Sequence, residues 1–304
     1  MRKLYIKIVR YIFLILSKFP LKFHYFMGDI LSWTARNIMR YRYEEVTINI
    51  SRAFPKRRYK GVRQIISDFY THFGELFAET VWFSGSSYAR LRKEGIAEIA
   101  NPEVLSRLYD NAPSVTLLCT HCGNWELLGG LFGYRTLNGG KLSMGEKDTI
   151  VAYKAQKNPV MDEVFRMNRT NPLKEVGIEC TVESRNILRY SIKNKAEKKL
   201  YIYPADQAPY AGTGKFPIGN FLNQNTYAMA GSIGVACKLS HAVAYMKMKR
   251  VRRGYYEISF IPICENASLM SQEDILRKYY DLLEEEITET PANWLWSHRR
   301  WKKQ

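Results

Sequence analysis

The spacing of apolar residues along the chain predicts strands that alternate with helices. Short apolar runs of strand length lie at 114–120, 149–154, 199–204, 241–249 and 255–263. Stretches with helical spacing lie between and after them, at 124–135, 159–168, 182–194, 226–239 and 271–288. Strands alternating with helices of this length are typical of a mainly parallel sheet. We therefore expect an α/β fold with a mainly parallel central sheet flanked by helices.

The first 43 residues follow another pattern, in which basic residues interleave with aliphatic and aromatic ones. It predicts two helices, at about 2–19 and 22–42, ahead of a basic loop at 51–60 and a helix at 61–83. The longest uncharged run in this segment, at 11–17, is far shorter than the ~18–20 residues needed to cross a bilayer.

We therefore expect residues 1–43 to anchor the chain by lying in the membrane interface, and residues 44–304 to form the α/β domain. Basic side chains of the first helix would then reach toward lipid headgroups, namely Lys3, Lys7, Arg10 and Lys18. A short spanning or re-entrant helix and a core helix are the alternatives. A signal peptide is less consistent with the sequence, because no small-residue cleavage site follows the apolar run.

Charge supports a membrane surface as a partner. The chain of 304 residues has a net charge of +17, and residues 1–60 hold 14 Lys and Arg against 3 Asp and Glu. Such an excess suits nucleic acid or an anionic membrane. The aliphatic and aromatic residues among these cations favour the membrane, so we expect no nucleic-acid partner.

The strand expected at 114–120 leads into the segment Thr120–Glu126, which holds His121 and Glu126. On one continuous helix two residues five apart point about 140° away from each other, at ~100° per residue. If His121 instead lies in a turn before the helix, a carboxylate in the first helical turn can reach it. A carboxylate that orients an imidazole prepares it to take a proton from a hydroxyl. The alternative is a histidine that only caps the helix.

The same segment offers little for a metal. Cys119 and Cys122 bracket His121, but zinc needs two further ligands at a matching spacing, and the sequence has no second such pair. Cys119 falls in the apolar run and suits packing. Five cysteines in a chain of this length suggest a reducing compartment.

Two later segments carry candidate polar groups. Asn158-Pro159 suits a helix start, and the helix would bring Asp162, Arg166 and Arg169 within reach of one another. A surface ion pair is the alternative. Asp206-Gln207 follows the strand at 199–204 and suits a site loop or a plain turn.

The last aromatic and basic stretch, at 294–303, suits either a headgroup-binding rim or packing against the sheet edge. Small residues in the helix expected at 226–239 suit close packing or the approach of a lipid tail.

These segments resemble a known family. His-x4-Glu after a strand resembles the signature of the glycerolipid acyltransferase superfamily, and His121-x-x-Asn124-Trp125-Glu126 resembles its lipid A late (secondary) acyltransferase branch. Four further blocks resemble that branch in the same order, and together the five span nearly the whole chain: Tyr153-x4-Asn158-Pro159-x2-Asp162-x6-Arg169, Ala205-Asp206-Gln207, Phe216 and Gly219 with Thr226, and Trp294 to Lys302.

The resemblance implies an O-acyltransferase that moves a fatty acyl chain from acyl carrier protein, or from coenzyme A, to a hydroxyl of a lipid A precursor. It implies no metal, no cofactor and no acyl-enzyme. His121 would act as the general base and Glu126 would orient it. Substrate contacts would come from Asn124, Arg166, Arg169, Asp206 and Gln207, with the arginines facing phosphate or oxyanion charge.

The resemblance also implies a location at the cytoplasmic face of the bacterial inner membrane. Acyl carrier proteins are acidic, so a basic surface would steer the donor. Two alternatives remain. One is an acyltransferase for another acceptor, such as a lysophospholipid, a glycosylated phosphatidylinositol or an aminolipid. The other is a non-catalytic basic binder of membranes or nucleic acid, which would not need His121 and Glu126 together.

Overall fold

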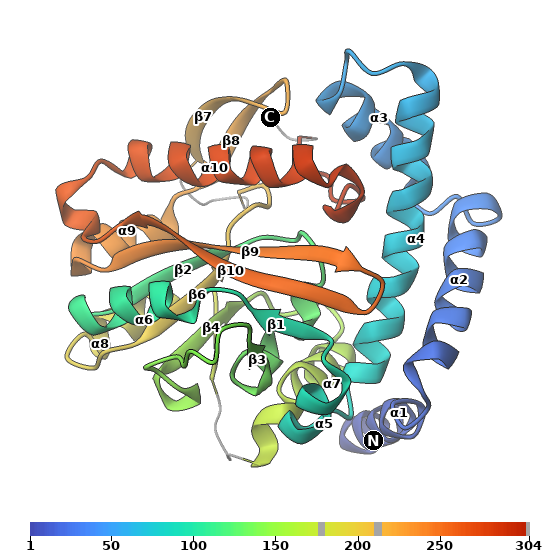
Figure 1. Cartoon of the computed structure of the whole chain (residues 1–304), viewed down its shortest axis with the longest axis horizontal. Helices are drawn as coiled ribbons and strands as arrows, with labels where there is room; N and C mark the ends of the chain where they lie inside the picture. The colour runs from blue at the N-terminus through green and yellow to red at the C-terminus, as the bar shows by residue number, and fades with distance from the viewer. Residues whose placement is uncertain (176–179, 210–214, 302–304) are drawn as a thin grey trace.

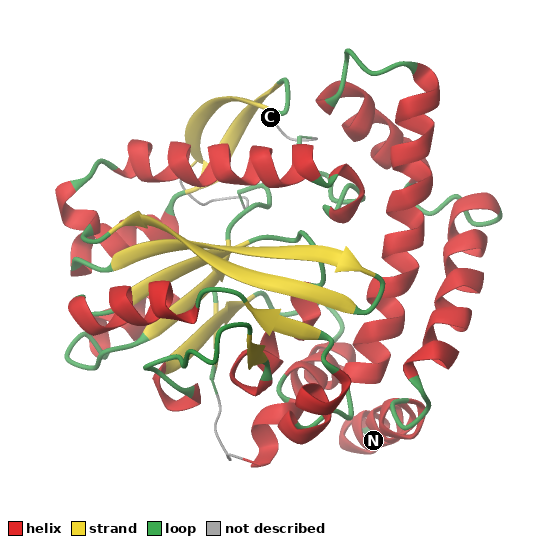
Figure 2. Ribbon diagram, in the orientation of Figure 1, coloured by secondary structure: helices red, strands yellow, loops and turns green. Residues whose placement is uncertain are grey.

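An eight-stranded sheet in the order β3-β1-β10-β9-β2-β6-β4-β5 forms the centre of the computed structural model, which describes residues 1–175, 180–209 and 215–301 (Figures 1 and 2). Each neighbouring pair in this order runs parallel, except β9 with β10. The expected mainly parallel α/β sheet is therefore confirmed. The strands are β1 (Ala97–Ile99), β2 (Val115–Cys119), β3 (Arg135–Thr136), β4 (Thr149–Tyr153), β5 (Thr181–Glu183), β6 (Leu200–Pro204), β9 (Ala242–Arg252) and β10 (Tyr255–Cys264).

Helices cover both faces of this sheet, which is why its strands are apolar on both sides. In β9, Val243 and Tyr245 belong to one core cluster while Ala244 and Met246 belong to the other. Helices α9 and α10 contribute to the first cluster and α6 to the second. The helices are α1 (Arg2–Leu16), α2 (Leu21–Asn37), α3 (Tyr43–Ala53), α4 (Tyr59–Phe83), α5 (Tyr88–Glu94), α6 (Pro102–Asn111), α7 (Pro159–Arg169), α8 (Ile187–Lys193), α9 (Gly231–Leu239) and α10 (Gln272–Glu289).

Two predicted helices are partly wrong. The segment 182–194 begins in β5, and only Ile187–Lys193 forms α8. The segment 226–239 begins in β8 (Gln224–Met229), which pairs antiparallel with β7 (Lys215–Phe221), and only its second half forms α9. The apolar and small residues there fit either structure locally, and pairing with β7 decides between them.

The N-terminal helices lie along the right-hand side in Figure 1, where α2 runs beside α4. The two helices cross closely at Gly28 and Gly74: a Cβ on Gly28 would come within 2.6 Å of the Gly74 carbonyl oxygen. None of the helices in the described part of the chain is long and apolar enough to span a membrane. The division into an anchor at 1–43 and a domain at 44–304 stays a prediction.

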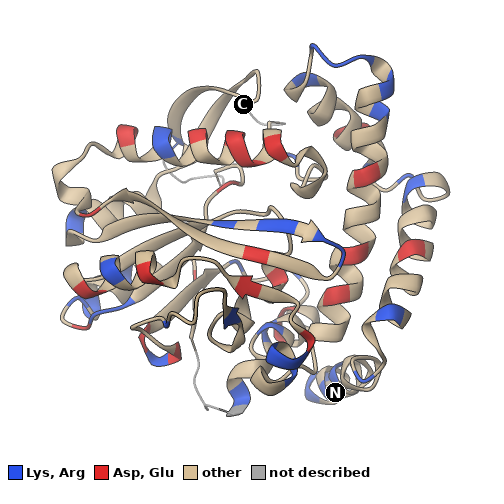
Figure 3. Cartoon of the chain, in the orientation of Figure 1, with Lys and Arg blue, Asp and Glu red and all other residues tan. Residues whose placement is uncertain are grey.

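Arg10 corrects one detail of the expected anchor. Its side chain is only 3% exposed and donates to the side chains of Asn168 and Asn171 instead of reaching toward headgroups. Exposed cations gather elsewhere, along the loop between α3 and α4 (Figure 3), at Arg52, Lys56, Arg57, Arg58 and Lys60.

Helix α4 crosses the edge of the sheet at which β2 and β9 end (Figure 1). The turn between β9 and β10 meets α2 and α4 there, where Arg253 pairs with Asp29 and Glu75. In parallel sheets ligands bind beyond the carboxyl ends of the strands, so this edge is the place to look for a site.

Candidate active site

The segment after β2 forms a tight turn held by its own polar groups. Thr120 Oγ1 accepts a hydrogen bond from the Cys122 amide, at 3.1 Å. Gly123 has a φ of 60°, in the left-handed region, and a Cβ there would meet the Met248 carbonyl oxygen at 2.5 Å. Only glycine suits both conditions. The turn therefore lies directly against β9.

His121 lies in this turn, as predicted, and its partner is Asp206. Nδ1 of His121 is 2.6 Å from Asp206 Oδ1, and the His121 amide donates to Asp206 Oδ2 at 3.0 Å. The indole of Trp294 donates to the same Oδ2, at 2.8 Å. The sheet register explains the meeting: Cys119 pairs with Pro204 in the neighbouring parallel strand, and His121 and Asp206 each follow two residues later.

This geometry leaves the other ring nitrogen of His121 as the base. A carboxylate only accepts hydrogen bonds, so Nδ1 carries the hydrogen and Nε2 carries the lone pair. Nε2 receives the Gln207 amide, at 3.0 Å. The side chain of His121 is 13% exposed while that of Asp206 is 1% exposed, so the imidazole lies between a buried acid and the surface.

Asp206 stays charged over the whole physiological range. Burial alone would raise the pKa of its carboxyl, but the charge and hydrogen bonds of His121, with the Trp294 indole, outweigh burial and lower the pKa to about 2. The anion therefore stabilises the protonated imidazole that a general base becomes after taking a proton.

Glu126 does not orient His121, which corrects the expected pair. Both of its carboxylate oxygens bind Arg169 of α7, at 2.6 Å from Nε and 2.6 Å from Nη2, and Oε1 also receives the indole of Trp125. Burial would raise the pKa of Glu126, but Arg169 outweighs burial and lowers it. The reason is local: residues 125–133 form a 3₁₀ helix, not the expected α-helix, and Glu126 meets α7 from its first turn.

Asn124 also differs from expectation, because it is fully buried. Its Oδ1 caps the 3₁₀ helix by accepting from the Glu126 amide, at 3.1 Å, and its Nδ2 donates to Glu79 Oε2, at 2.7 Å. Both ends of the side chain are used within the protein, so it holds the turn and does not face a substrate.

Helix α7 begins as predicted, because Asn158 Oδ1 accepts from the amides of Val160 and Met161. Two side chains of the expected cluster also have other partners, and the charge of Asp162 still acts on Arg169. Arg166 binds both oxygens of Glu163, whereas Asp162 accepts from the Gln156 amide.

The C-terminal aromatic segment packs inside the molecule as far as it is described. Trp294 and Trp296 are buried, and buried Arg300 donates to the Tyr227 carbonyl oxygen and the Tyr280 hydroxyl. Lys302 and Lys303 lie outside the described residues. The sequence marked Trp294 as part of an unusual aromatic and basic stretch, but it did not predict that the indole binds Asp206.

In the described part of the chain, no group of three or more His, Cys, Asp and Glu side chains is arranged to hold a metal ion. The site offers a buried anion, an oriented imidazole and a neighbouring carboxylate–guanidinium pair, which together suit proton transfer from a hydroxyl.

Comparison with known proteins gives one result that spans the chain. The family model described as bacterial lipid A biosynthesis acyltransferase matches residues 2–303. A search of curated proteins found no match.

Proposed function

The chain belongs to the bacterial lipid A biosynthesis acyltransferase family, and we propose that it moves a fatty acyl chain from acyl carrier protein to a hydroxyl of a lipid A precursor. Membership supports an acyltransferase role in lipid A synthesis. The donor, the acceptor and the ester product are the parts that we propose.

The observation that carries the proposal is the His121–Asp206 pair, with Nε2 of His121 left as the base. The acceptor hydroxyl would replace the Gln207 amide as the partner of Nε2. As its oxygen attacks the thioester carbonyl, Nε2 takes the hydroxyl proton. The carbon–sulfur bond then breaks, and the departing thiolate receives that proton from the imidazolium. The products are the ester and the free thiol, with no covalent intermediate on the protein.

Arg169 and Arg166 are the proposed contacts for negative charge on the acceptor or on the tetrahedral oxyanion. Arg169 is anchored on Glu126, and its side chain is still 37% exposed. A guanidinium held in this way can offer its remaining N–H groups in a fixed direction to phosphate.

A membrane acceptor fits the surface of the N-terminal helices. Large apolar side chains are exposed along both, and Tyr11, Phe26 and Trp33 are each at least 60% exposed. Soluble monomers seldom expose so many neighbouring apolar groups. We propose that α1 and α2 lie on the anionic cytoplasmic face of the inner membrane, with acidic acyl carrier protein approaching the basic surface of the chain.

The test is acyl transfer by the purified protein. It should convert a phosphorylated lipid A precursor in vesicles to a product heavier by one acyl group when acyl carrier protein bears the chain, and mass spectrometry of fragments should locate an ester. Lysophospholipid acceptors and acyl-coenzyme A serve as competing substrates. Preferential acylation of a lysophospholipid would replace the proposed acceptor, and no transfer from either donor would overturn the proposal.

Membrane binding has its own test. Because α2 packs against α4, removing residues 1–43 would disturb more than the surface, so exposed side chains are the sharper target. Replacing Phe26 and Trp33 together with serine should weaken sedimentation with anionic vesicles at least ~10-fold, as expected for the loss of two large apolar side chains from the interface. Replacement of exposed Leu269, which lies after β10, is the matched control.

A further inference from the structure

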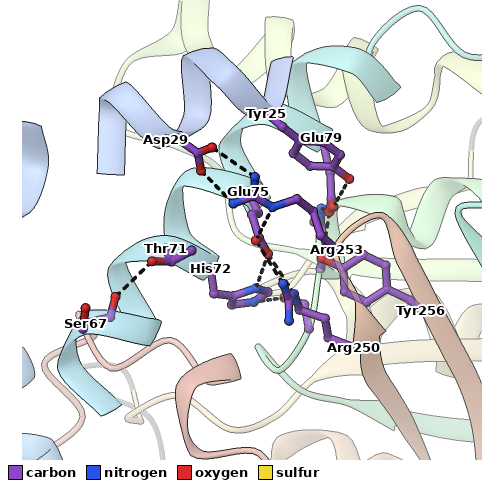
Figure 4. A network of polar contacts seen from close by, with 12 residues as sticks. Tyr25, Asp29, Ser67, Thr71, His72, Glu75, Glu79, Arg250, Arg253 and Tyr256 are labelled. Carbon is purple, nitrogen blue, oxygen red and sulfur yellow. Dashed lines mark hydrogen bonds and ion pairs between the residues drawn. The ribbon is translucent and has the colours of Figure 1, made fainter. Parts of the chain in front are cut away.

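Helix α4 carries three ionisable side chains on one buried face (Figure 4), and two of them bind the turn that holds His121. His72, Glu75 and Glu79 follow at spacings of three and four, which places them in a row along the helix. All three are no more than 4% exposed. This row faces the strand ends, α2 and the turn at once.

Glu79, fully buried, is the centre of the row. Its Oε1 accepts from the Tyr25 hydroxyl of α2, and its Oε2 accepts from the Tyr256 hydroxyl of β10 and from Asn124 Nδ2, each at 2.7 Å. A buried carboxylate is costly unless several donors satisfy it. Three elements far apart in sequence supply those donors.

The two bonds of Asn124 fix which way that side chain points. The backbone amide of Glu126 can only donate, so the NH₂ group of Asn124 faces Glu79 and its carbonyl oxygen faces that amide. That second bond starts the 3₁₀ helix which carries Glu126 toward Arg169. A chain of polar contacts thus runs from Glu79 through Asn124 to the start of the site.

A neighbouring contact holds the same turn from the same helix. The His72 ring donates from Nε2 to the Gly123 carbonyl oxygen, at 3.0 Å. Consecutive residues of the turn, Gly123 and Asn124, are therefore both bound to α4. An apolar side chain at Glu79 would fill the space, but it would leave the buried NH₂ group of Asn124 without the acceptor that ties the turn to α4.

We propose that Glu79 is a positioning residue for acyl transfer: it acts through Asn124 to hold the turn that presents His121 and Glu126. This inference rests on the proposed function, in which His121 is the base. Glu79 touches no substrate, so its effect should appear in kcat and in the rigidity of the turn, with little change in KM.

The test exchanges donor and acceptor across the bond. Asn124→Asp keeps the cap on the Glu126 amide but sets a second carboxylate against Glu79, and it should lower kcat at least ~30-fold. Glu79→Gln alone can still accept from Asn124 and should cost about threefold to fivefold. In the double variant Glu79→Gln/Asn124→Asp, the glutamine NH₂ donates to the aspartate, and kcat should return to within ~fivefold of Glu79→Gln. Such reversal in a double-mutant cycle reports a direct interaction.

Tyr256→Phe is the control, because it removes another donor from the same oxygen of Glu79 and leaves the bond to Asn124 in place. It should change kcat less than ~threefold. If Asn124→Asp does not fold, Glu79→Met, which offers no acceptor at all, takes its place and should lower kcat at least ~10-fold without raising KM for the acceptor more than ~threefold.

Amide hydrogen exchange at residues 120–126 gives a readout that needs no activity. It should quicken at least ~10-fold in Asn124→Asp or Glu79→Met, remain near wild type in Tyr256→Phe, and slow again in the double variant. If wild type transfers no acyl group while these exchange differences appear, the proposed function fails and the positioning of the turn stands. Wild-type kcat and wild-type exchange in Glu79→Met, or a double variant no better than Asn124→Asp, would overturn the inference.

Discussion

Two histidine–carboxylate pairs lie on opposite sides of the turn after β2. His121 Nδ1 is 2.6 Å from Asp206, and His72 Nδ1 is 3.8 Å from Glu75, which is too long for a hydrogen bond. The two pairs differ most at the second ring nitrogen. In the described part of the chain, Nε2 of His121 is bound to the Gln207 amide near the surface, whereas Nε2 of His72 is bound to the Gly123 carbonyl oxygen in the interior.

The carboxylates differ in what else they bind. Burial would raise the pKa of Glu75, but the hydrogen bonds and charges of Arg250 and Arg253 outweigh burial and lower the pKa to about 2, as for Asp206. Glu75 reaches this state with two arginines from the β9–β10 region, and Asp206 with the imidazole itself and an indole. A lowered pKa is thus shared by both acids, and access to Nε2 separates the reactive pair from the structural one.

The same substitution in two histidines should give the largest contrast. His121→Gln removes the base and should lower kcat at least ~100-fold, the scale of general-base catalysis. His241→Gln is the control, because His241 is also buried and bonds to Thr116 at the opposite end of β2. It should keep kcat within ~threefold. Steady-state kinetics, measured below the melting temperature of each variant, gives kcat for both. A kcat for His121→Gln within threefold of wild type would refute the mechanism.

Replacing Asp206, the acid of the reactive pair, should have the next largest effect on kcat. Asp206→Asn keeps the shape but removes the charge that stabilises the imidazolium and the acceptor that fixes its tautomer, so kcat should fall ~30-fold or more. A kcat within threefold of wild type would mean that Asp206 serves the fold alone. Trp294→Phe, which removes one donor to Asp206 and leaves its charge in place, should lower kcat by a smaller factor.

The pairing of His121 with Asp206 shows how far sequence reasoning reaches. The buried strands, the helix start at Asn158-Pro159 and the turn with His121 follow from local patterns, and the structure agrees with them. The choice between Glu126 and Asp206 as the partner of His121 depends on which strands are neighbours. His121 directly follows the strand predicted at 114–120, and Asp206 follows the strand predicted at 199–204 by two residues. A parallel pairing of these two strands brings the side chains together. Glu126 was favoured because it is near in sequence and because His-x4-Glu resembles the superfamily signature.

Other features carry no local signal. Glu79 and His72 lie in a predicted helix among apolar residues, and their role depends on α2, β10 and the turn meeting there. The 3₁₀ helix at residues 125–133 has apolar residues at helical spacing, but Gly129 lies so close to the Arg169 carbonyl oxygen that a Cβ would come within 1.8 Å. Tertiary contact, not propensity, sets its form.

Replacing one arginine beside each histidine–carboxylate pair tests whether Arg169 binds phosphate of the acceptor. Arg169→Lys cannot hold both oxygens of Glu126, so the KM for a phosphorylated acceptor should rise ~10-fold and that for the donor much less. An acceptor without phosphate should be affected less. Arg250→Lys is the matched variant, because Arg250 binds both oxygens of Glu75 in the same way on the structural side. Equal effects of the two variants on acceptor KM would remove the phosphate assignment and leave proton transfer at His121 untouched.

The acid of the structural pair should affect turnover least and stability most. The folded-state pKa of Glu75, about 2, lies below the ~4.3 of an unfolded glutamate. Its charge therefore stabilises the fold fully above pH ~4.3, by about 3 kcal/mol, and this is lost as the pH falls toward 2. Glu75→Gln should keep kcat within ~threefold at neutral pH while lowering the free energy of unfolding by about 2–3 kcal/mol, and the difference from wild type should shrink by pH 3.

Glu289→Gln is the control, because Glu289 has the same lowered pKa beside Lys247 and Lys249 but lies at the surface. Solvent screens that pair, so its loss should cost less than ~1 kcal/mol. Denaturant unfolding at pH 7 and pH 3 checks both variants. If the loss of unfolding free energy in Glu75→Gln were the same at both pH values, the charge of Glu75 would not be what stabilises the fold.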